Sequence, residues 1–316
     1  MSPAAPLCAD GARERGDDLV GTAAPAHRWL LVEHPGPWAV DALAGSGIDK
    51  EVQDRLRLAA HRSGARILLV RRPGRQPARR RRSWAVVDAG STAVRWGAWS
   101  AGEDLLEAAV ALSDVTAASG GPGGAPGTAA DGDAPGPGQP LLLVCAHGRH
   151  DTCCAVRGRP VADQLGQRWP DATWECSHVG GDRFAANLMV LPDGACYGNL
   201  DADSAVDVVT AHLQGRVDVD HLRGVSTQPP VAQAAIAAAL RRFGPAALSQ
   251  VGVGGVEPRG SETWRVTLTG TGPVPRRVEA TVLRTRTAPA RLTCRAAGPT
   301  TAFRYEVPDL RQVGAP

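Results

Sequence analysis

The chain has 316 residues and a formal net charge of +3, with 43% hydrophobic and 21% charged residues. This length allows about two domains with hydrophobic cores of their own, and the composition is typical of a globular protein. No run of about 18 apolar residues occurs, which excludes a transmembrane helix and a membrane partner. The N-terminal stretch MSPAAPLCADGARERGDD lacks the pattern of a secretory signal, so we expect a cytoplasmic protein.

The N-terminal part predicts an α/β subdomain over residues 17–114. WLLVEHPGPW predicts a strand that ends in a Pro/Gly turn, and apolar side chains at Ile48, Val52 and Leu56 have helical spacing. ARILLVRR, SWAVVDA and VRWGAW predict three further strands. The next segment, residues 115–140, is rich in Gly, Pro and Ala and predicts a flexible linker.

After the linker, strands and helices follow in the order β-α-β-β-β-α. LLLVCAH predicts a buried strand, a helix begins at Asp151 or Thr152, and ATWECSH predicts the next strand. FAANLMVLPDG and ACYGNL predict a hairpin, and Asp201 opens another helix. The tail, residues 246–316, contains three alternating segments, WRVTLTG, RRVEATVLR and TAFRYEV, which predict a small antiparallel β unit.

A cysteine-rich motif, CAHGRHDTCCAVRG, joins the predicted strand to the predicted helix. Cys145 lies at the strand end, while Cys153 and Cys154 lie at the helix start. A helix N-terminus favours the thiolate form, which soft metals and iron–sulfur clusters require. His147 and His150 in the same motif either donate hydrogen bonds to the metal-binding residues or are turn residues, and we favour turn residues. Seven cysteines in a chain expected in the cytoplasm indicate thiol or metal chemistry rather than a disulfide framework.

A second motif, ECSHVGGDRFAANL, follows the next predicted strand and carries Cys176, His178 and Asp182. The glycine pair between His178 and Asp182 predicts a tight loop rather than a helix. Because both motifs follow strands of one predicted sheet, they could converge on one site.

The patterns C-x-H-G-x-x-D-x-C-C-x-x-x-G and H-V-G-G-x-R-F-A-x-N, followed by L-P-x-G and Y-G, resemble the sucrase/ferredoxin-like family. The N-terminal phrases GTA, WLLVE-x-PGPW and LLVRRPGR extend the resemblance over most of residues 17–245. Members of this family are thioredoxin-like 2Fe–2S ferredoxins. The resemblance therefore implies a thioredoxin-like ferredoxin domain over residues 141–245.

In this family two cysteines and the two histidines of an H-x-x-x-H motif hold the cluster. The resemblance assigns these roles to Cys145, Cys154 and His178, and Asp182 stands where the second histidine is expected. The fourth ligand is therefore Asp182 or a thiolate, with Cys176 and Cys153 as the alternatives. Imidazole ligands raise the potential of such a cluster. The implied function is electron transfer or redox sensing with a protein partner, in an electron carrier rather than a catalyst.

Two other functions fit the same residues. A thiol–disulfide oxidoreductase would use the cysteines directly, although the chain has no C-x-x-C motif. A zinc-binding module would use the same Cys, Cys, His and Asp or Cys donors. No pair of carboxylates has the character of a glycosidase site, so we do not expect glycoside hydrolysis.

The run RRPGRQPARRRR, from Arg71 to Arg82, is the only strongly basic stretch. It contains two prolines and no aromatic residue, and the whole chain is barely basic, so we expect a solvated loop rather than a nucleic-acid site. Such a loop could dock an acidic redox partner.

Overall fold

The computed structural model describes residues 7–75, 80–91, 93–117 and 139–314. Contacts between residues divide the chain into two compact units. Unit 1 comprises Met1–Pro25, Gly180–Asn187 and Ala195–Pro316, and unit 2 comprises Ala26–Val179 and Leu188–Gly194. The mixed α/β fold expected from the sequence is confirmed, and the predicted order β-α-β-β-β-α is observed as β5, α4, β6, β7, β8 and α5.

Unit 2 contains a mixed sheet in which the strand order is β4-β3-β1-β2-β6-β5-β7. The strands are β1 (Arg28–Glu33), β2 (Ala65–Arg71), β3 (Arg82–Asp88), β4 (Ala93–Trp99), β5 (Leu141–Cys145), β6 (Thr173–Cys176) and β7 (Leu188–Leu191). The pairs β1–β2 and β5–β6 are parallel, and the other pairs are antiparallel. Strand β5 is buried along its whole length, as its run of apolar residues predicts.

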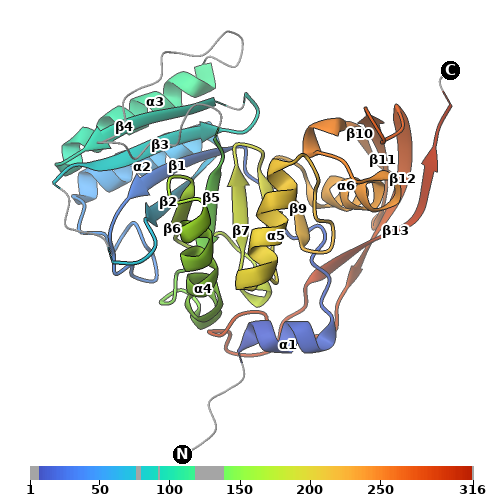
Figure 1. Cartoon of the computed structure of the whole chain (residues 1–316), viewed down its shortest axis with the longest axis horizontal. Coiled ribbons are helices and arrows are strands. Elements are labelled where there is room, and N and C mark those ends of the chain that lie inside the picture. The colour runs from blue at the N-terminus through green and yellow to red at the C-terminus, as the bar shows by residue number, and fades with distance from the viewer. Residues whose placement is uncertain (1–6, 76–79, 92, 118–138, 315–316) are drawn as a thin grey trace, which may run out of the picture. The chain divides into compact units, whose positions relative to one another are not determined.

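Two helices of unit 2 pack against each other and against strands β1 to β4 (Figure 1). Helix α2 (Lys50–Ser63) begins where the Asp49 side chain accepts a hydrogen bond from the Glu51 N–H, and it ends at Gly64. Helix α3 (Leu106–Ala117) follows a short 3-10 turn, η1 (Gly102–Leu105). Helix α3 includes the first residues of the predicted linker 115–140, and residues 118–138 of that linker lie outside the described residues. The predicted division into residues 17–114, 115–140, 141–245 and 246–316 stays a prediction.

The third helix of unit 2, α4 (Thr152–Arg168), packs against β5 and β6. Its β5–α4–β6 connection places the C-terminal ends of two parallel strands at one edge of the sheet, because Cys145 and Cys176 are register partners. Backbone segments that follow β5 and β6 therefore begin side by side.

Two arginines at the start of the run from Arg71 to Arg82 contact other parts of unit 2. Arg71 forms an ion pair with Glu175, with 2.6 Å between Nε and the carboxylate oxygen. The guanidinium of Arg72 lies 3.7 Å from the ring centroid of Trp174. Residues 76–79 of the run lie outside the described residues. These contacts make Arg71 and Arg72 part of the folded structure. Gly74, Arg75, Arg80 and Arg81 of the run are exposed, as expected for a solvated loop.

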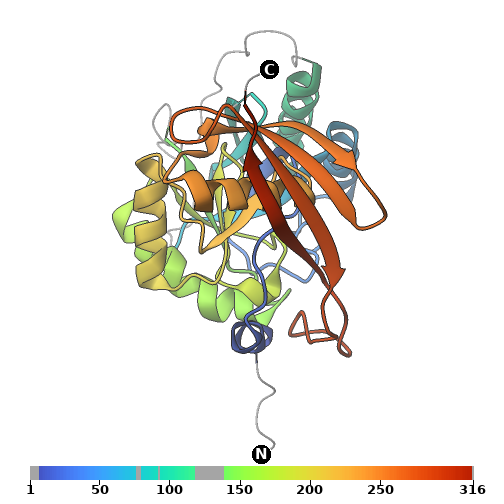
Figure 2. The same cartoon turned by 90° about the vertical axis from the view of Figure 1, so that its right-hand side faces the viewer.

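Unit 1 carries the second sheet, in which four antiparallel strands follow the order β10-β11-β12-β13, with helix α6 packed on it (Figure 2). Its elements are α1 (Cys8–Arg15), η2 (Asp182–Phe184), β8 (Ala195–Tyr197), α5 (Ala202–Leu213), β9 (Leu222–Val225), α6 (Pro230–Phe243), η3 (Leu248–Gln250), β10 (Val251–Pro258), β11 (Thr263–Gly270), β12 (Arg277–Arg286) and β13 (Phe303–Gln312). Three strands of this sheet were expected, and β10 is an addition.

A buried arginine of unit 1 holds the Gly180–Asn187 segment. Arg223, of which 2% is exposed, donates hydrogen bonds to the Gly180 carbonyl and to Asn187 Oδ1, each at 2.9 Å, and to Thr22. Gly181 has a φ of 80°, and a Cβ atom there would lie 2.2 Å from the Arg223 guanidinium. The glycine pair thus forms the tight loop that the sequence predicts.

Among the described residues, no helix combines the length and the apolar character needed to cross a membrane.

Candidate metal centre

Three of the predicted ligand residues come together in unit 2. The Sγ atoms of Cys145 and Cys154 and a ring nitrogen of His178 all lie within 4.8 Å of one another. Cys145 ends β5, Cys154 lies in the first turn of α4, and His178 lies two residues beyond the end of β6. The convergence follows from the parallel pairing of β5 and β6, which brings the two motifs to the same edge of the sheet.

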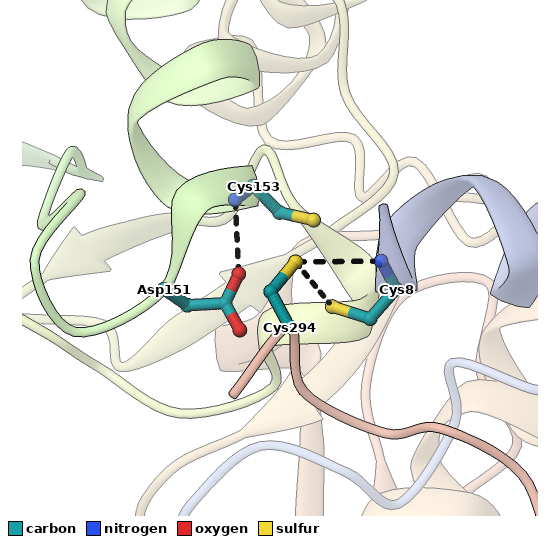
Figure 3. A group of neighbouring side chains, drawn as sticks. All are labelled: Cys8, Asp151, Cys153 and Cys294. Carbon is teal, nitrogen blue, oxygen red and sulfur yellow. Dashed lines mark hydrogen bonds between the residues drawn. The ribbon is translucent and has the colours of Figure 1, made fainter. Parts of the chain in front are cut away.

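The start of α4 is fixed against the end of β5 by a cap and by a glycine. Asp151 Oδ1 accepts a hydrogen bond of 2.9 Å from the Cys153 N–H, which satisfies one of the free donors at the helix N-terminus (Figure 3). A Cβ atom at Gly158 would lie 2.1 Å from the carbonyl oxygen of Cys145. Only glycine allows this approach, and the approach places Cys154 beside Cys145.

The electrostatic surroundings of Cys145 favour its thiolate. A hydrogen bond with Cys154 holds the pKa of the buried Cys145 thiol well below its ordinary value, although burial by itself raises that pKa. His178 and the backbone N–H of Val179 lower the pKa further. A thiolate is the form of cysteine that binds metal ions.

His147 orients the segment that carries His178. Its Nε2 donates a hydrogen bond of 2.6 Å to the Ala39 carbonyl, and its Nδ1 accepts one of 3.3 Å from the His178 backbone N–H. These two contacts fix the neutral tautomer with the proton on Nε2. Burial lowers the pKa of His147, which agrees with a neutral ring. His147 is therefore a positioning residue and more than a turn residue.

His150 is a further candidate metal ligand, although the sequence predicted it to be a turn residue. Its ring stacks on the His178 ring, with 3.8 Å between the centroids and 20° between the planes. Ring nitrogens of the two histidines lie within 4.8 Å of each other. A signal existed in the sequence, because His150 directly precedes the N-cap residue of the helix that carries Cys154.

Three further residues were predicted as possible fourth ligands. Cys153 and Cys176 are buried, and among the described residues neither joins the group of Cys145, Cys154 and His178. Asp182 is buried in unit 1, where it begins η2. The assignment of Asp182, Cys153 or Cys176 as the fourth ligand stays a prediction.

Comparison with protein families gives a match. The model of a family described as sucrase/ferredoxin-like matches residues 19–224. The matched range contains both cysteine motifs and covers well over half of the chain. Neither the curated proteins nor the solved structures compared with the chain gave a match.

Proposed function

The chain belongs to the sucrase/ferredoxin-like family, and from this premise we propose that it binds a 2Fe–2S cluster and transfers single electrons or senses redox state. The observation that carries the proposal is the convergence of Cys145, Cys154 and His178 within 4.8 Å.

The chemistry of these donors suits the cluster. Iron–sulfur clusters are held by thiolates, and in Rieske centres two histidines replace two cysteines on one iron. Cys145 and Cys154 supply two thiolates, one of them with a lowered pKa, and His178 supplies an imidazole. When bound, the cluster would supply reversible one-electron transfer, at a potential that imidazole ligands raise.

The chain's own residues would hold and shield this centre. Cys145 and Cys154 are buried and exclude water from the thiolate side, whereas His178 is partly exposed. His147 fixes the backbone of His178. The exposed edge of His178 is therefore the place where we expect a proton to exchange and a protein redox partner to approach.

Two residues compete for the fourth position. Asp182 stands where the family motif has its second histidine, and it would contribute a carboxylate oxygen. His150 would complete a set of two cysteines and two histidines, because its ring already stacks on that of His178. Cys153 and Cys176 remain further alternatives.

The experiment is anaerobic purification followed by absorption and EPR spectroscopy, with iron and sulfide counted per chain. We expect a 2Fe–2S spectrum in the wild type and its loss in Cys145→Ala, Cys154→Ala and His178→Ala. Cys196→Ala, which removes a buried cysteine of β8, is the matched control and keeps the cluster. A colourless protein without iron after reconstitution would contradict the proposal.

The fourth ligand is tested on the same samples with His150→Ala and Asp182→Ala. The residue that serves as ligand, once replaced, shifts the EPR g values or lowers the iron content. If Asp182→Ala keeps a full cluster with an unchanged spectrum, Asp182 is not the ligand, and the same reasoning applies to His150.

Zinc binding is the second candidate, and one observation favours it. Zinc binds thiolates at about 2.3 Å and imidazoles at about 2.0–2.1 Å, so ligand atoms around one ion lie closer together than about 4.6 Å. The 4.8 Å limit on the group of Cys145, Cys154 and His178 suits a single ion with small adjustments. Stoichiometric zinc without sulfide would establish this candidate, and a reversible two-thiol change in metal-free protein would favour the oxidoreductase.

We also expect a reducing, cytoplasmic compartment. All seven cysteines lie within the described residues and are thiols. Thiols of this number are typical of reducing compartments, and fractionation of cells with an antibody against the protein tests the location.

A further inference from the structure

A second pair of cysteines lies in unit 1. The Sγ atoms of Cys8 and Cys294 are 3.6 Å apart and hydrogen-bonded, although the residues are 286 positions apart in the chain. Figure 3 shows the two sulfur atoms facing each other. Cys8 is the first residue of α1, and Cys294 lies in the irregular segment between β12 and β13.

A backbone N–H and two arginines interact with the pair. The backbone N–H of Cys8 donates a hydrogen bond of 3.4 Å to Cys294 Sγ, so this sulfur lies at the N-terminus of α1. Arg15 and Arg183 both interact electrostatically with Cys8. Hydrogen-bond donors and cations beside a cysteine favour the thiolate, which is the form that reacts with oxidants.

The two thiols differ in access. Cys8 is 2% exposed, whereas Cys294 is half-buried. A small oxidant therefore reaches Cys294 first, and Cys8 is placed to react with the oxidised sulfur.

We propose that Cys8 and Cys294 form a reversible disulfide when the protein meets hydrogen peroxide. The Cys294 thiol attacks peroxide and becomes a sulfenic acid, and one water leaves. The Cys8 sulfur then attacks the sulfenic sulfur, which forms the disulfide and releases a second water. Two thiols thus lose two electrons and two protons, and one peroxide becomes two waters. A dithiol reductant restores both thiols.

The structure allows the bond to form. A disulfide requires about 2.05 Å between sulfurs, so the pair must approach by about 1.5 Å. Cys294 lies outside the regular strands, and its segment can move without breaking the pairing of β12 with β13.

The disulfide would act on the segment that carries Asp182. Helix α1 packs on η2, Arg13 donates a hydrogen bond of 2.9 Å to the Ala185 carbonyl, and Arg183 forms an ion pair of 3.2 Å with Asp17. A covalent link at Cys8 therefore restrains α1 and, through these contacts, η2. An effect on the metal centre through Asp182 rests on the proposed function, whereas the disulfide itself does not.

The test is peptide mapping of the full-length protein after treatment with peroxide and alkylation. We expect a linked peptide containing Cys8 and Cys294, its loss after dithiothreitol, and a higher melting temperature of the oxidised form. Cys196→Ala is the matched control and keeps the link. Absence of a Cys8–Cys294 peptide from the oxidised wild type would overturn the proposal.

Two variants test the order of the steps, and a third separates this proposal from the metal centre. In Cys8→Ser the sulfenic acid on Cys294 cannot be resolved, so dimedone labels it; in Cys294→Ser this label is lost. Equal labelling of both variants would overturn the assignment of Cys294 as the attacking thiol. Cys145→Ala protein, which cannot hold the proposed cluster, should form the link as readily as the wild type.

Discussion

Gly158 shows how one residue sets the distance between the two cysteines of the candidate centre. Glycine lowers helix propensity, so Gly158 by itself weakens the first turns of α4. In the structure, the absence of a side chain allows the α-carbon of Gly158 to pack directly against the carbonyl of Cys145. A residue that costs helix stability thus permits the close packing that brings Cys154 to Cys145.

We predict that Gly158→Ala separates the two cysteines. The added methyl group would lie 2.1 Å from the Cys145 carbonyl oxygen, so α4 must shift, at a cost of about 1–3 kcal/mol in unfolding free energy. Denaturant unfolding should show this loss, and metal content per chain should fall. Gly166→Ala is the control in the same helix, because its Cβ would meet only the Pro73 side chain, at 3.3 Å. Equal stability and metal content in the two variants would contradict the prediction.

Single residues of the centre could be predicted from the sequence to different degrees. Cys145, Cys154 and His178 were predicted because the resemblance to the family assigns them as ligands, and their positions at strand ends and a helix start agree with that assignment. His150 was not predicted as a metal ligand, because the stacking of its ring on His178 depends on how two loops fold against each other. The local pattern of the loop around His150 equally suits a turn.

At the scale of elements, strands and helices could be predicted wherever the apolar residues recur with a clear period. Strands β1 to β7 and helices α2 and α4 follow predicted segments of the sequence. Helices α1 and α3 and strands β9 and β10 were not predicted. LEAAVALSDVTA in α3 is apolar on most sides, and VGVGGVEP in β10 contains three glycines, so neither shows the period of its element.

The capping of α4 leads to an element-scale prediction. Asp151→Ala removes the acceptor of the Cys153 N–H and should cost about 1 kcal/mol in unfolding free energy. Asp49→Ala removes the equivalent cap of α2 in the same unit and should cost about the same. Only Asp151→Ala should also lower metal retention, because Cys154 lies in the turn that the cap holds.

The control for this prediction is Asp151→Asn, since asparagine also caps helices and should restore both stability and metal retention. Metal content and denaturant midpoint are measured on all three variants. If Asp49→Ala loses as much metal as Asp151→Ala, the cap has no specific role at the centre.

At the scale of the whole molecule, contacts join parts of the chain that sequence patterns do not connect. Unit 1 combines Met1–Pro25 with Gly180–Asn187 and the C-terminal part, and buried Arg223 bonds to the first two of these segments. No local period indicates such a link, because it depends on hydrogen bonds between residues far apart in the chain.

The tryptophans are unevenly divided between the two units. Seven of the eight, all but Trp264, belong to unit 2, so intrinsic fluorescence mainly reports the unfolding of that unit.

This fluorescence allows a test of how the stability of unit 2 depends on pH. His34 is half-buried, its Nε2 donates a hydrogen bond of 2.7 Å to the Ser46 carbonyl, and its Nδ1 accepts one from the Gly36 N–H. Burial lowers the pKa of His34 below its ordinary value of 6.5, and the charge of Arg82 adds to the lowering. The neutral ring is therefore the form that the folded state holds.

The sign of the effect follows from proton binding. Below pH 6.5 the unfolded chain binds a proton at His34 that the folded chain does not bind until its lower pKa is reached. The contribution of His34 to the unfolding free energy of unit 2 should therefore be complete above pH 6.5 and should decrease as the pH falls below 6.5. His34→Gln keeps a donor for the Ser46 carbonyl and cannot titrate, so it should remove part of this slope. The pKa of His147 is also lowered, so His147 should account for part of the pH dependence that remains in this variant. Urea unfolding followed by tryptophan fluorescence at several pH values measures the slope, and an unchanged slope in His34→Gln would show that His34 does not contribute.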